Sequence, residues 1–132
     1  MMDLEILKIA SDNNNKSIHN CTHRSKLKNH LCGDEIQIKM IIESDKILEF
    51  GYEGKSCIYC QAAANLLSKI SLNKKKSKIN ELCDDAKSFF EGDSEVIKKK
   101  WKLMNKLFNS KNKIRKECIL LPFKTVKKIV SI

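Results

Sequence analysis

The segment that decides the fold is "CGDEIQIKMIIESDKILEFGYEGKSC", residues 32–57. Apolar and polar side chains alternate over residues 35–42, and this period of two is typical of a half-buried strand. The sequence "ESDK" (43–46) predicts a turn, and residues 47–54 predict a second strand. We expect three apolar residues of the second strand to share one face: Leu48, Phe50 and Tyr52. The segment therefore predicts an antiparallel hairpin.

Helical patterns follow the hairpin. Residues 56–70 begin with a serine suited to an N-cap and continue with alanines and leucines at helical spacing. We expect further helices over 80–90, capped by Asn80, and over 94–108, capped by Ser94. A last helix is predicted from Cys118 to the end of the sequence, with Pro122 in its first turn.

The sequence before the hairpin is less regular. Residues 3–10 can begin a short helix, with Leu4, Ile6 and Leu7 on its apolar side. Residues 11–30, "SDNNNKSIHNCTHRSKLKNH", are polar and predict an irregular connection. Together these patterns predict one domain over residues 1–132, of α+β class, with a small antiparallel sheet whose helices pack on one face.

Composition and charge narrow the class of protein. The chain has 132 residues and a formal net charge of +10, which is typical of nucleic-acid-binding proteins. However, the lysines are scattered, and Arg24 and Arg115 are the two arginines, although arginine suits phosphate and guanine best. We therefore interpret the basic residues as a solvated surface and do not expect nucleic acid as a partner. A basic nucleic-acid-binding module with a structural zinc remains the alternative from a different class.

The six cysteines are informative because of the compartment that the sequence predicts. The N-terminal apolar run is too short for a secretory signal, and no stretch approaches the length of a membrane span, so we expect a cytoplasmic protein that does not contact membranes. Thiols stay reduced in the cytoplasm. We therefore expect metal ligands, sulfur carriers or core residues rather than disulfides, with Cys60 and Cys83 in the core.

The hairpin predicts which cysteines meet. Cys32 precedes its first strand and Cys57 follows its second, so antiparallel pairing brings both to the same end of the sheet. Cys118, ahead of the last helix, is a third candidate for that end. Three thiolates and the carboxylate of Asp34 would suit Zn²⁺ or an iron–sulfur unit. Because a carboxylate binds soft metals less tightly than a thiolate, Asp34 indicates a site that exchanges its contents.

Cys57 and Cys60 also form a Cys-x-x-Cys pair at the start of a helix, which is typical of dithiol redox proteins. A helix N-terminus favours the thiolate form of Cys57. The sequence lacks the alternating βαβ pattern of thioredoxin-like folds, so a dithiol redox protein is a second alternative rather than the main prediction.

Three motifs resemble the SufU/IscU (NifU-like) family of iron–sulfur cluster assembly proteins. "NHLCGD" (29–34) matches a Cys-Gly-Asp motif that follows an asparagine. "YEGKSCIYCQAAANLL" (52–67) matches an aromatic and acidic-glycine stretch that ends in a cysteine before a small-residue helix, and "RKECILLPF" (115–123) matches an arginine three residues before a cysteine. The order and spacing of the motifs make the resemblance cover about residues 29–132.

The resemblance implies a site and a branch of the family. It implies that Cys32, Asp34, Cys57 and Cys118 hold Zn²⁺ or a transient [2Fe–2S] or [4Fe–4S] cluster. The long segment between the second and third motifs favours the SufU branch, as does Glu117 where the IscU branch has a histidine. The family's N-terminal helix and its histidine-tyrosine and asparagine-proline stretch are not visible in residues 8–27, and Lys55 and Ser56 replace an acidic residue and a glycine.

The implied role is that of a scaffold, or of a sulfurtransferase-like sulfur acceptor. The resemblance implies three classes of partner: a cysteine desulfurase of the SufS/NifS type, an iron donor, and apo iron–sulfur proteins. We expect Cys32 to accept sulfur because it lies beside a glycine in a loop that can move, with Cys118 as the alternative. Arg115 is expected to stabilise the anionic thiolates or persulfide by charge.

Overall fold

The computed structural model describes residues 4–11, 18, 20–92 and 94–131. Three strands form one antiparallel sheet in the order β1-β2-β3: β1 (His23–Lys28), β2 (Glu35–Glu43) and β3 (Lys46–Glu53). The helical elements are α1 (Leu4–Ser11), α2 (Ile58–Ser71), α3 (Lys76–Gly92), α4 (Val96–Lys100), the 3₁₀ helices η1 (Lys102–Lys106) and η2 (Ser110–Arg115), and α5 (Lys116–Val130).

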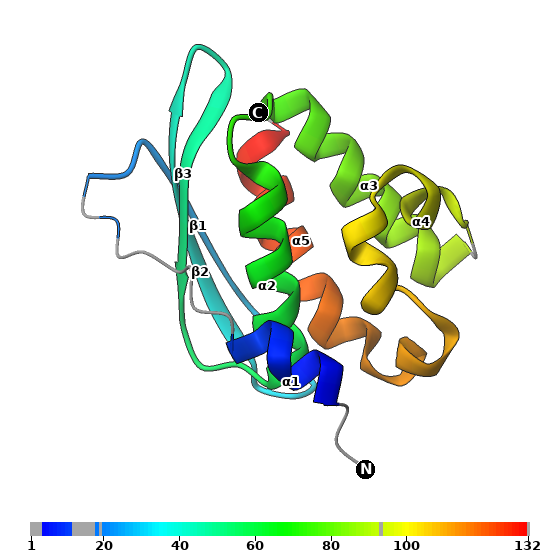
Figure 1. Ribbon diagram of the computed structural model, residues 1–132. Coiled ribbons are helices and arrows are strands. Elements are labelled where there is room, and N and C mark those ends of the chain that lie inside the picture. The colour runs from blue at the N-terminus through cyan, green and yellow to red at the C-terminus, as the bar shows by residue number, and fades with distance from the viewer. Residues whose placement is uncertain (1–3, 12–17, 19, 93, 132) are drawn as a thin grey trace.

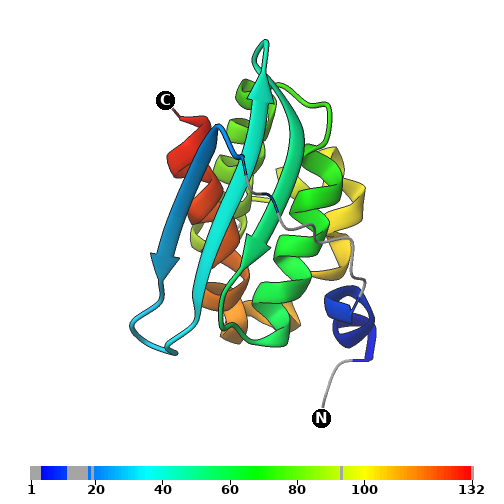
Figure 2. The same cartoon turned by 90° about the vertical axis from the view of Figure 1, so that its left-hand side faces the viewer.

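The helices lie on one face of the sheet, and none of the described helices covers the other face (Figures 1 and 2). α5 packs against β1 and β2, α2 packs against β3 and α5, and α3 contacts the side of α5 away from the sheet. This arrangement confirms the predicted α+β class. Within the described residues, no helix has both the length and the apolar character needed to cross a membrane.

The hairpin of β2 and β3 confirms the central prediction, with one local difference. Ser44 and Asp45 have φ values of 51° and 67°, as a two-residue turn between twisted strands requires. The pairing shifts register between Ile41 and Ile42, so Ile47 rather than Leu48 enters the core. Leu48 is 40% exposed, and the prediction that it shares the buried face with Phe50 was wrong because a bulge reverses the alternation.

β1 was predicted as part of an irregular connection, and that prediction was wrong. His23–Lys28 pairs with β2 along its full length, with Leu27 opposite Ile36 and Ser25 opposite Ile38. Its burial alternates between half-buried and exposed positions. An edge strand over a helix needs few apolar side chains, so its sequence resembles that of a loop.

The short helix predicted over residues 3–10 is confirmed as α1, but Leu4 does not lie on its buried side. α1 packs against α2, and Ile6 is fully buried, whereas Leu4 is 78% exposed. The amide of Asn65 donates hydrogen bonds to the carbonyls of Ile9 and Ala10, at 2.9 and 3.0 Å. Because Asn65 lies on α2, it satisfies carbonyls at the end of α1 that have no partner within the helix.

The starts of α2 and α3 differ from the predictions. α2 begins after Cys57, which takes the N-cap position expected for Ser56. α3 begins at Lys76 rather than after Asn80, because the Lys76 N–H donates to the carbonyl of Asp45 in the hairpin turn, at 3.0 Å. A tertiary contact thus supplies the acceptor that an N-cap side chain would have provided. Asn80 instead lies within α3 and accepts a hydrogen bond from Lys127, at 2.7 Å.

The predicted helix over 94–108 is divided. α4 ends at Lys100, and Trp101 has a non-helical backbone (φ −127°, ψ 78°) before η1. The consecutive lysines that end α4 favour a helix C-terminus through the helix dipole. The break keeps the indole of Trp101 buried, with Lys78 Nζ at 5.5 Å from its ring centroid.

Pro122 lies in the second turn of α5 rather than the first, because the helix begins at Lys116. A proline inside a helix has no N–H to donate to the carbonyl four residues earlier. In α5 that carbonyl belongs to Cys118, so the helix leaves this acceptor without its usual partner.

Candidate metal centre

The three predicted motifs meet at one end of the sheet, where the β1–β2 connection lies beside the first turns of α2 and α5 (Figure 2). Within the described residues, ligand atoms of Cys32, Asp34 and Cys118 lie within 4.8 Å of one another. The Sγ atoms of Cys32 and Cys118 are 4.0 Å apart. Cys32 and Cys118, which are 86 positions apart in the sequence, therefore lie in one cluster.

Cys57 lies beside this cluster, although its sulfur is outside the set of atoms that meet within 4.8 Å. The backbone N–H of Cys57 donates to Oδ1 of Asp34, at 3.2 Å. The Glu35 N–H donates to the carbonyl of Lys55, at 2.8 Å, which ties the end of β3 to the start of β2. The prediction that the hairpin brings Cys57 to the site is thus confirmed for its backbone, and its role as a ligand stays a prediction.

The other carboxylate oxygen of Asp34 is left without a hydrogen-bond partner. Asp34 is 8% exposed, and Oδ2 is buried with no donor among the described residues. A buried carboxylate oxygen without a partner is unfavourable, and a cation between it and the thiolates would remove that cost. The donor set therefore fits a metal ion or a cluster.

The spacing of the thiols supports the same conclusion. Tetrahedral zinc binds each thiolate at about 2.3 Å, so two thiolates on one zinc lie about 3.8 Å apart. The observed 4.0 Å between Cys32 and Cys118 is close to this value and far from a disulfide bond, and all six cysteines are free.

The surroundings of Cys118 disfavour its thiolate form unless a cation is bound. Burial is the main cause that raises the pKa of the Cys118 thiol, and the nearby Cys57, Cys32 and Asp34 raise it further. These groups would repel one another if all were charged. A bound cation would lower the thiol pKa instead, because it favours the deprotonated forms.

Exposure separates the two candidate sulfur acceptors. Cys32 is exposed in the turn before β2, whereas Cys118 is 7% exposed at the start of α5. A partner protein could therefore reach the sulfur of Cys32 with little rearrangement.

Arg115 does not contact the thiols through any interaction seen among the described residues. It is exposed at the N-cap of α5, and its guanidinium lies over the ring of Tyr59, 5.4 Å from the centroid. Tyr59 is in the first turn of α2, so this cation–π contact joins the two helices that carry Cys57 and Cys118. The predicted charge stabilisation by Arg115 stays a prediction.

The cysteines predicted to lie in the core are there. Cys60 is fully buried and Cys83 is 4% exposed. Burial raises the pKa of each thiol to about 12. A redox-active dithiol needs an accessible thiol with a lowered pKa, so the environment of Cys60 disfavours the dithiol alternative.

Two residues that position the site were missed as functional residues. Asn29 closes the loop that carries Cys32: its carbonyl accepts the Gly33 N–H at 2.8 Å, its side chain accepts the Leu31 N–H at 2.9 Å, and its own N–H donates to the carbonyl of Asp34 at 2.7 Å. An asparagine three residues before Cys32 is a sequence signal for such a turn.

Gly54 is the second missed residue. Its φ is +139°, and a Cβ at this position would overlap the backbone carbonyl oxygen of Glu35. Only glycine therefore lets the end of β3 approach the start of β2 this closely. Its position in the sequence, between a predicted strand and a candidate ligand cysteine, could have indicated this close approach.

Comparisons with known proteins agree with this geometry. The family model described as "NifU-like N terminal domain" matches residues 6–89, which contain Cys32, Asp34 and Cys57. An uncharacterised protein from Borreliella burgdorferi is 30% identical over 127 residues, covering 93% of this chain and 84% of that protein. The iron–sulfur cluster assembly scaffold protein IscU from Thermotoga maritima is 28% identical over 102 residues, covering 76% of this chain and 70% of that protein.

A solved structure extends the likeness to the last helix. The crystal structure of a putative iron–sulfur cluster assembly scaffold protein for the SUF system from Fervidobacterium islandicum superposes with a TM-score of 0.82 and 25% identity, covering 96% of this chain and 94% of that chain. The family match begins at residue 6, so it includes most of α1, which lies before the three motifs. The chain belongs to the NifU-like N-terminal domain family.

Proposed function

We propose that this protein is a scaffold for iron–sulfur cluster assembly, and that the cluster is its cargo. The observation that carries the proposal is the convergence of Cys32, Asp34 and Cys118, whose ligand atoms lie within 4.8 Å, beside a buried Asp34 oxygen that has no partner among the described residues. Membership of the family and the likeness to IscU and SufU scaffolds support it. The TM-score of 0.82 and 25% identity with the SUF-system protein support the SufU branch.

The proposed ligands are Cys32, Asp34, Cys57 and Cys118. Thiolates are the ligands that iron–sulfur clusters and zinc prefer, and Asp34 supplies one oxygen. Cys57 already lies beside the others, because its N–H donates to Asp34 and its side chain interacts with the Cys118 thiol. The oxygen ligand makes one bond weaker than the thiolate bonds, which favours release of the cargo to an acceptor protein.

Sulfur delivery is proposed to begin at Cys32. A cysteine desulfurase would present a persulfide, and the Cys32 thiolate would attack its outer sulfur. A new S–S bond would form on Cys32, the S–S bond of the donor would break, and the electron pair would leave with the donor thiolate. The exposure of Cys32 supports this choice over Cys118.

The same donor set suits zinc, and Zn²⁺ bound before sulfur transfer is part of the proposal. Zinc would hold the thiolates together and keep them deprotonated. An iron donor and apo iron–sulfur proteins complete the proposed partners. We further propose that residues 1–132 act as one assembly domain in the cytoplasm, where the six free cysteines would remain reduced.

Anaerobic reconstitution with Fe²⁺ and sulfide tests the scaffold function. We expect the wild type to gain the visible absorption of a cluster, and Cys32→Ser, Cys57→Ser and Cys118→Ser each to lose most of it. Cys83→Ser is the matched control because this thiol is buried on α3, outside the site. Equal cluster loss in Cys83→Ser and Cys57→Ser would overturn the ligand assignment.

Mass spectrometry tests the sulfur step separately. After incubation with a cysteine desulfurase and cysteine, we expect a mass gain of about 32 per sulfur atom on Cys32. Cys32→Ser should abolish the gain, and Cys60→Ala should retain most of it. A wild type that assembles a cluster from free sulfide but takes no sulfur from the desulfurase would refute the donor step and leave the scaffold function standing.

A further inference from the structure

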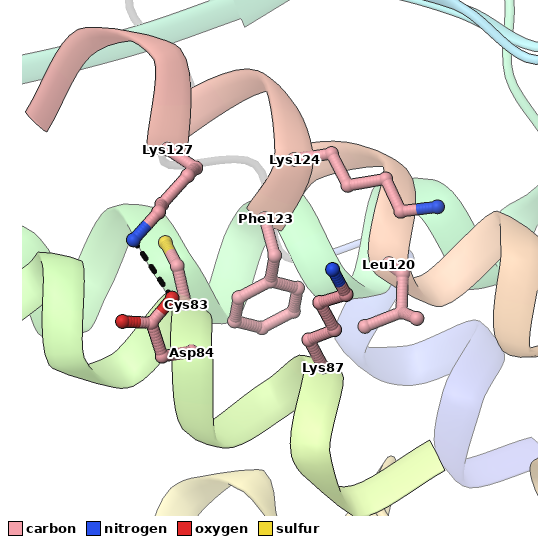
Figure 3. A pocket seen from close by; sticks show the side chains of 7 residues that line it. All are labelled: Cys83, Asp84, Lys87, Leu120, Phe123, Lys124 and Lys127. Atoms are coloured by element: carbon pink, nitrogen blue, oxygen red, sulfur yellow. Dashed lines mark hydrogen bonds and ion pairs between the residues drawn. The ribbon is translucent and has the colours of Figure 1, made fainter. Parts of the chain in front are cut away.

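A pocket lies between α3 and α5, and none of the candidate metal ligands lines it (Figure 3). Its volume is about 250 Å³. The floor is apolar: Leu120 and Phe123 are each 1% exposed, and Cys83 is 4% exposed. The ring of Phe123 packs edge-to-face on Phe108, with centroids 5.5 Å apart, which fixes its position.

The rim of the pocket is basic. Lys87 lines it from α3, and Lys124 and Lys127 line it from α5. In Figure 3 the ammonium group of Lys87 lies between the side chains of Phe123 and Leu120.

These ammonium groups differ in how firmly they are held. Lys127 is well paired, because its Nζ lies 2.7 Å from both Asp84 and Asn80. The ion pairs of the other two lysines are longer: Lys87 Nζ lies 3.9 Å from Glu91, and Lys124 Nζ lies 3.6 Å from Glu117. Exposed pairs of this kind contribute little stability, so a bound anion can replace them at small cost.

The balance of charge favours an anion over a cation. Asp84 is the one acidic residue among the described residues that line the pocket, and it is already paired with Lys127. A ligand carboxylate near Lys87 and Lys124 would meet two ammonium groups. The apolar floor requires that the rest of the ligand be hydrophobic.

The volume limits the size of the ligand. A buried cavity of about 150 Å³ is sufficient for benzene. A pocket of about 250 Å³ therefore has room for one aromatic ring and a carboxylate, but not for a folded segment of a partner protein. We propose that this pocket binds a small organic carboxylate whose apolar body is about the size of one aromatic ring.

Phenylacetate is a suitable probe for this site. Amide ¹H–¹⁵N spectra of the full chain are recorded during titration with phenylacetate at constant ionic strength. Acetate tests for a general effect of carboxylate, and phenylacetamide tests for binding without charge. We expect saturable shifts confined to α3 and α5 around residues 83–87 and 120–127, with phenylacetamide bound about threefold to tenfold more weakly and acetate without saturation.

Two lysine substitutions complete the test. Lys87→Gln should weaken phenylacetate about threefold to fivefold, since it removes one partly screened charge contact. Lys128→Gln is the control, because Lys128 is exposed on α5 but does not line the pocket, and it should change affinity less than twofold. Both positions are exposed, so neither substitution should unfold the chain.

Three results would overturn the proposal. Shifts that spread over all surface lysines, or that do not saturate, would show non-specific anion binding. Equal affinity for phenylacetate and phenylacetamide, or in Lys87→Gln and wild type, would show that the basic rim does not select the ligand. Shifts at the same residues with an acidic peptide, but none with phenylacetate, would assign the pocket to protein docking instead.

Discussion

Gly54→Ala is the substitution that tests most directly how the fold positions the candidate metal centre. Gly54 joins β3 to the segment that carries Cys57, and an added Cβ would overlap the carbonyl oxygen of Glu35 and lie 3.0 Å from its carbonyl carbon. Both neighbours are backbone atoms of a paired strand, so they cannot rotate away. The φ of +139° is itself unfavourable for alanine.

The size of the expected destabilisation follows from the overlap with Glu35 and from the unfavourable φ. A non-glycine residue in this backbone region costs about 1–3 kcal/mol, and forcing an extra carbon into a packed region costs a similar amount. We therefore expect Gly54→Ala to lower the free energy of unfolding by about 3 kcal/mol or more. With a urea dependence of about 1.5 kcal/mol per molar, the unfolding midpoint should fall by about 2 M.

Two other glycines provide matched controls. Gly33 has a φ of +78°, but a Cβ there would meet no atom within 4 Å, so Gly33→Ala should cost about 1 kcal/mol from the backbone alone. Gly92 has neither constraint, and Gly92→Ala should leave the midpoint unchanged or slightly raised. The assay is urea unfolding followed by far-UV circular dichroism. A midpoint for Gly54→Ala equal to that of Gly33→Ala would refute the argument from close approach.

The remaining predictions concern the cargo, the charge, the thiols and the polar contact under α1. Asp34→Ala should make a reconstituted cluster longer-lived, because the weaker oxygen ligand is lost; faster decay of its visible absorption than in the wild type would contradict this. Duplex DNA should bind no more tightly than about 10⁻⁴ to 10⁻⁶ M at physiological salt in a fluorescence anisotropy titration, and sequence-dependent binding that survives high salt would revive the nucleic-acid alternative. The thiol of Cys83 has a pKa of about 12 in the folded state and of about 9 in the unfolded state. The stability that the neutral thiol contributes is therefore complete below pH 9 and is lost as the pH rises toward 12. Between pH 9 and 10.5 the unfolding free energy of the wild type should therefore fall more steeply than that of Cys83→Ala, by about 1 kcal/mol per pH unit, and parallel curves would refute this. Tyr52→Phe removes the hydroxyl that donates to the buried side-chain oxygen of Asn65 and should cost about 1–3 kcal/mol in urea unfolding, whereas a neutral effect would mean that water replaces the hydroxyl.

The parts of the fold that follow from local patterns were predictable. The β2–β3 hairpin has strict alternation and a turn with polar residues, and α2 has helical spacing from residue 58 onward. The helix boundaries that were predicted wrongly depend on tertiary contacts. α3 begins early because of the Asp45 carbonyl, and no local pattern in residues 71–80 reports that acceptor.

The candidate site was predictable to the extent that it depends on the hairpin. Antiparallel pairing alone brings Asp34 to Cys57, whereas the position of Cys118 depends on how α5 packs across the sheet. That packing is non-local, so the sequence pattern offered Cys118 only as a candidate, and the resemblance to known proteins supported its assignment to the other ligands. The cation–π contact of Arg115 with Tyr59 could not be predicted, since both residues are partners only after α2 and α5 pack together.

β1 has a consequence for how copies of this chain behave at high concentration. It is an edge strand, with β2 on one side, and an unpaired edge is a template on which another chain can add a strand. Its exposed positions are Arg24, Lys26 and Lys28. A second copy that paired along this edge would bring like charges together.

The same residues therefore explain both why β1 resembled a loop in sequence and why its edge resists intermolecular pairing. Replacing the three basic residues with threonine would increase strand propensity and make the strand easier to recognise. It would also remove the charge repulsion between copies, so aggregation during expression should increase while the isolated fold stays intact. The edge of β3 is partly covered, because Ile47 exchanges backbone hydrogen bonds with Asn73 and Lys74. The basic residues that prevent other chains from pairing with this edge are thus the reason why residues 23–28 do not show a clear strand pattern.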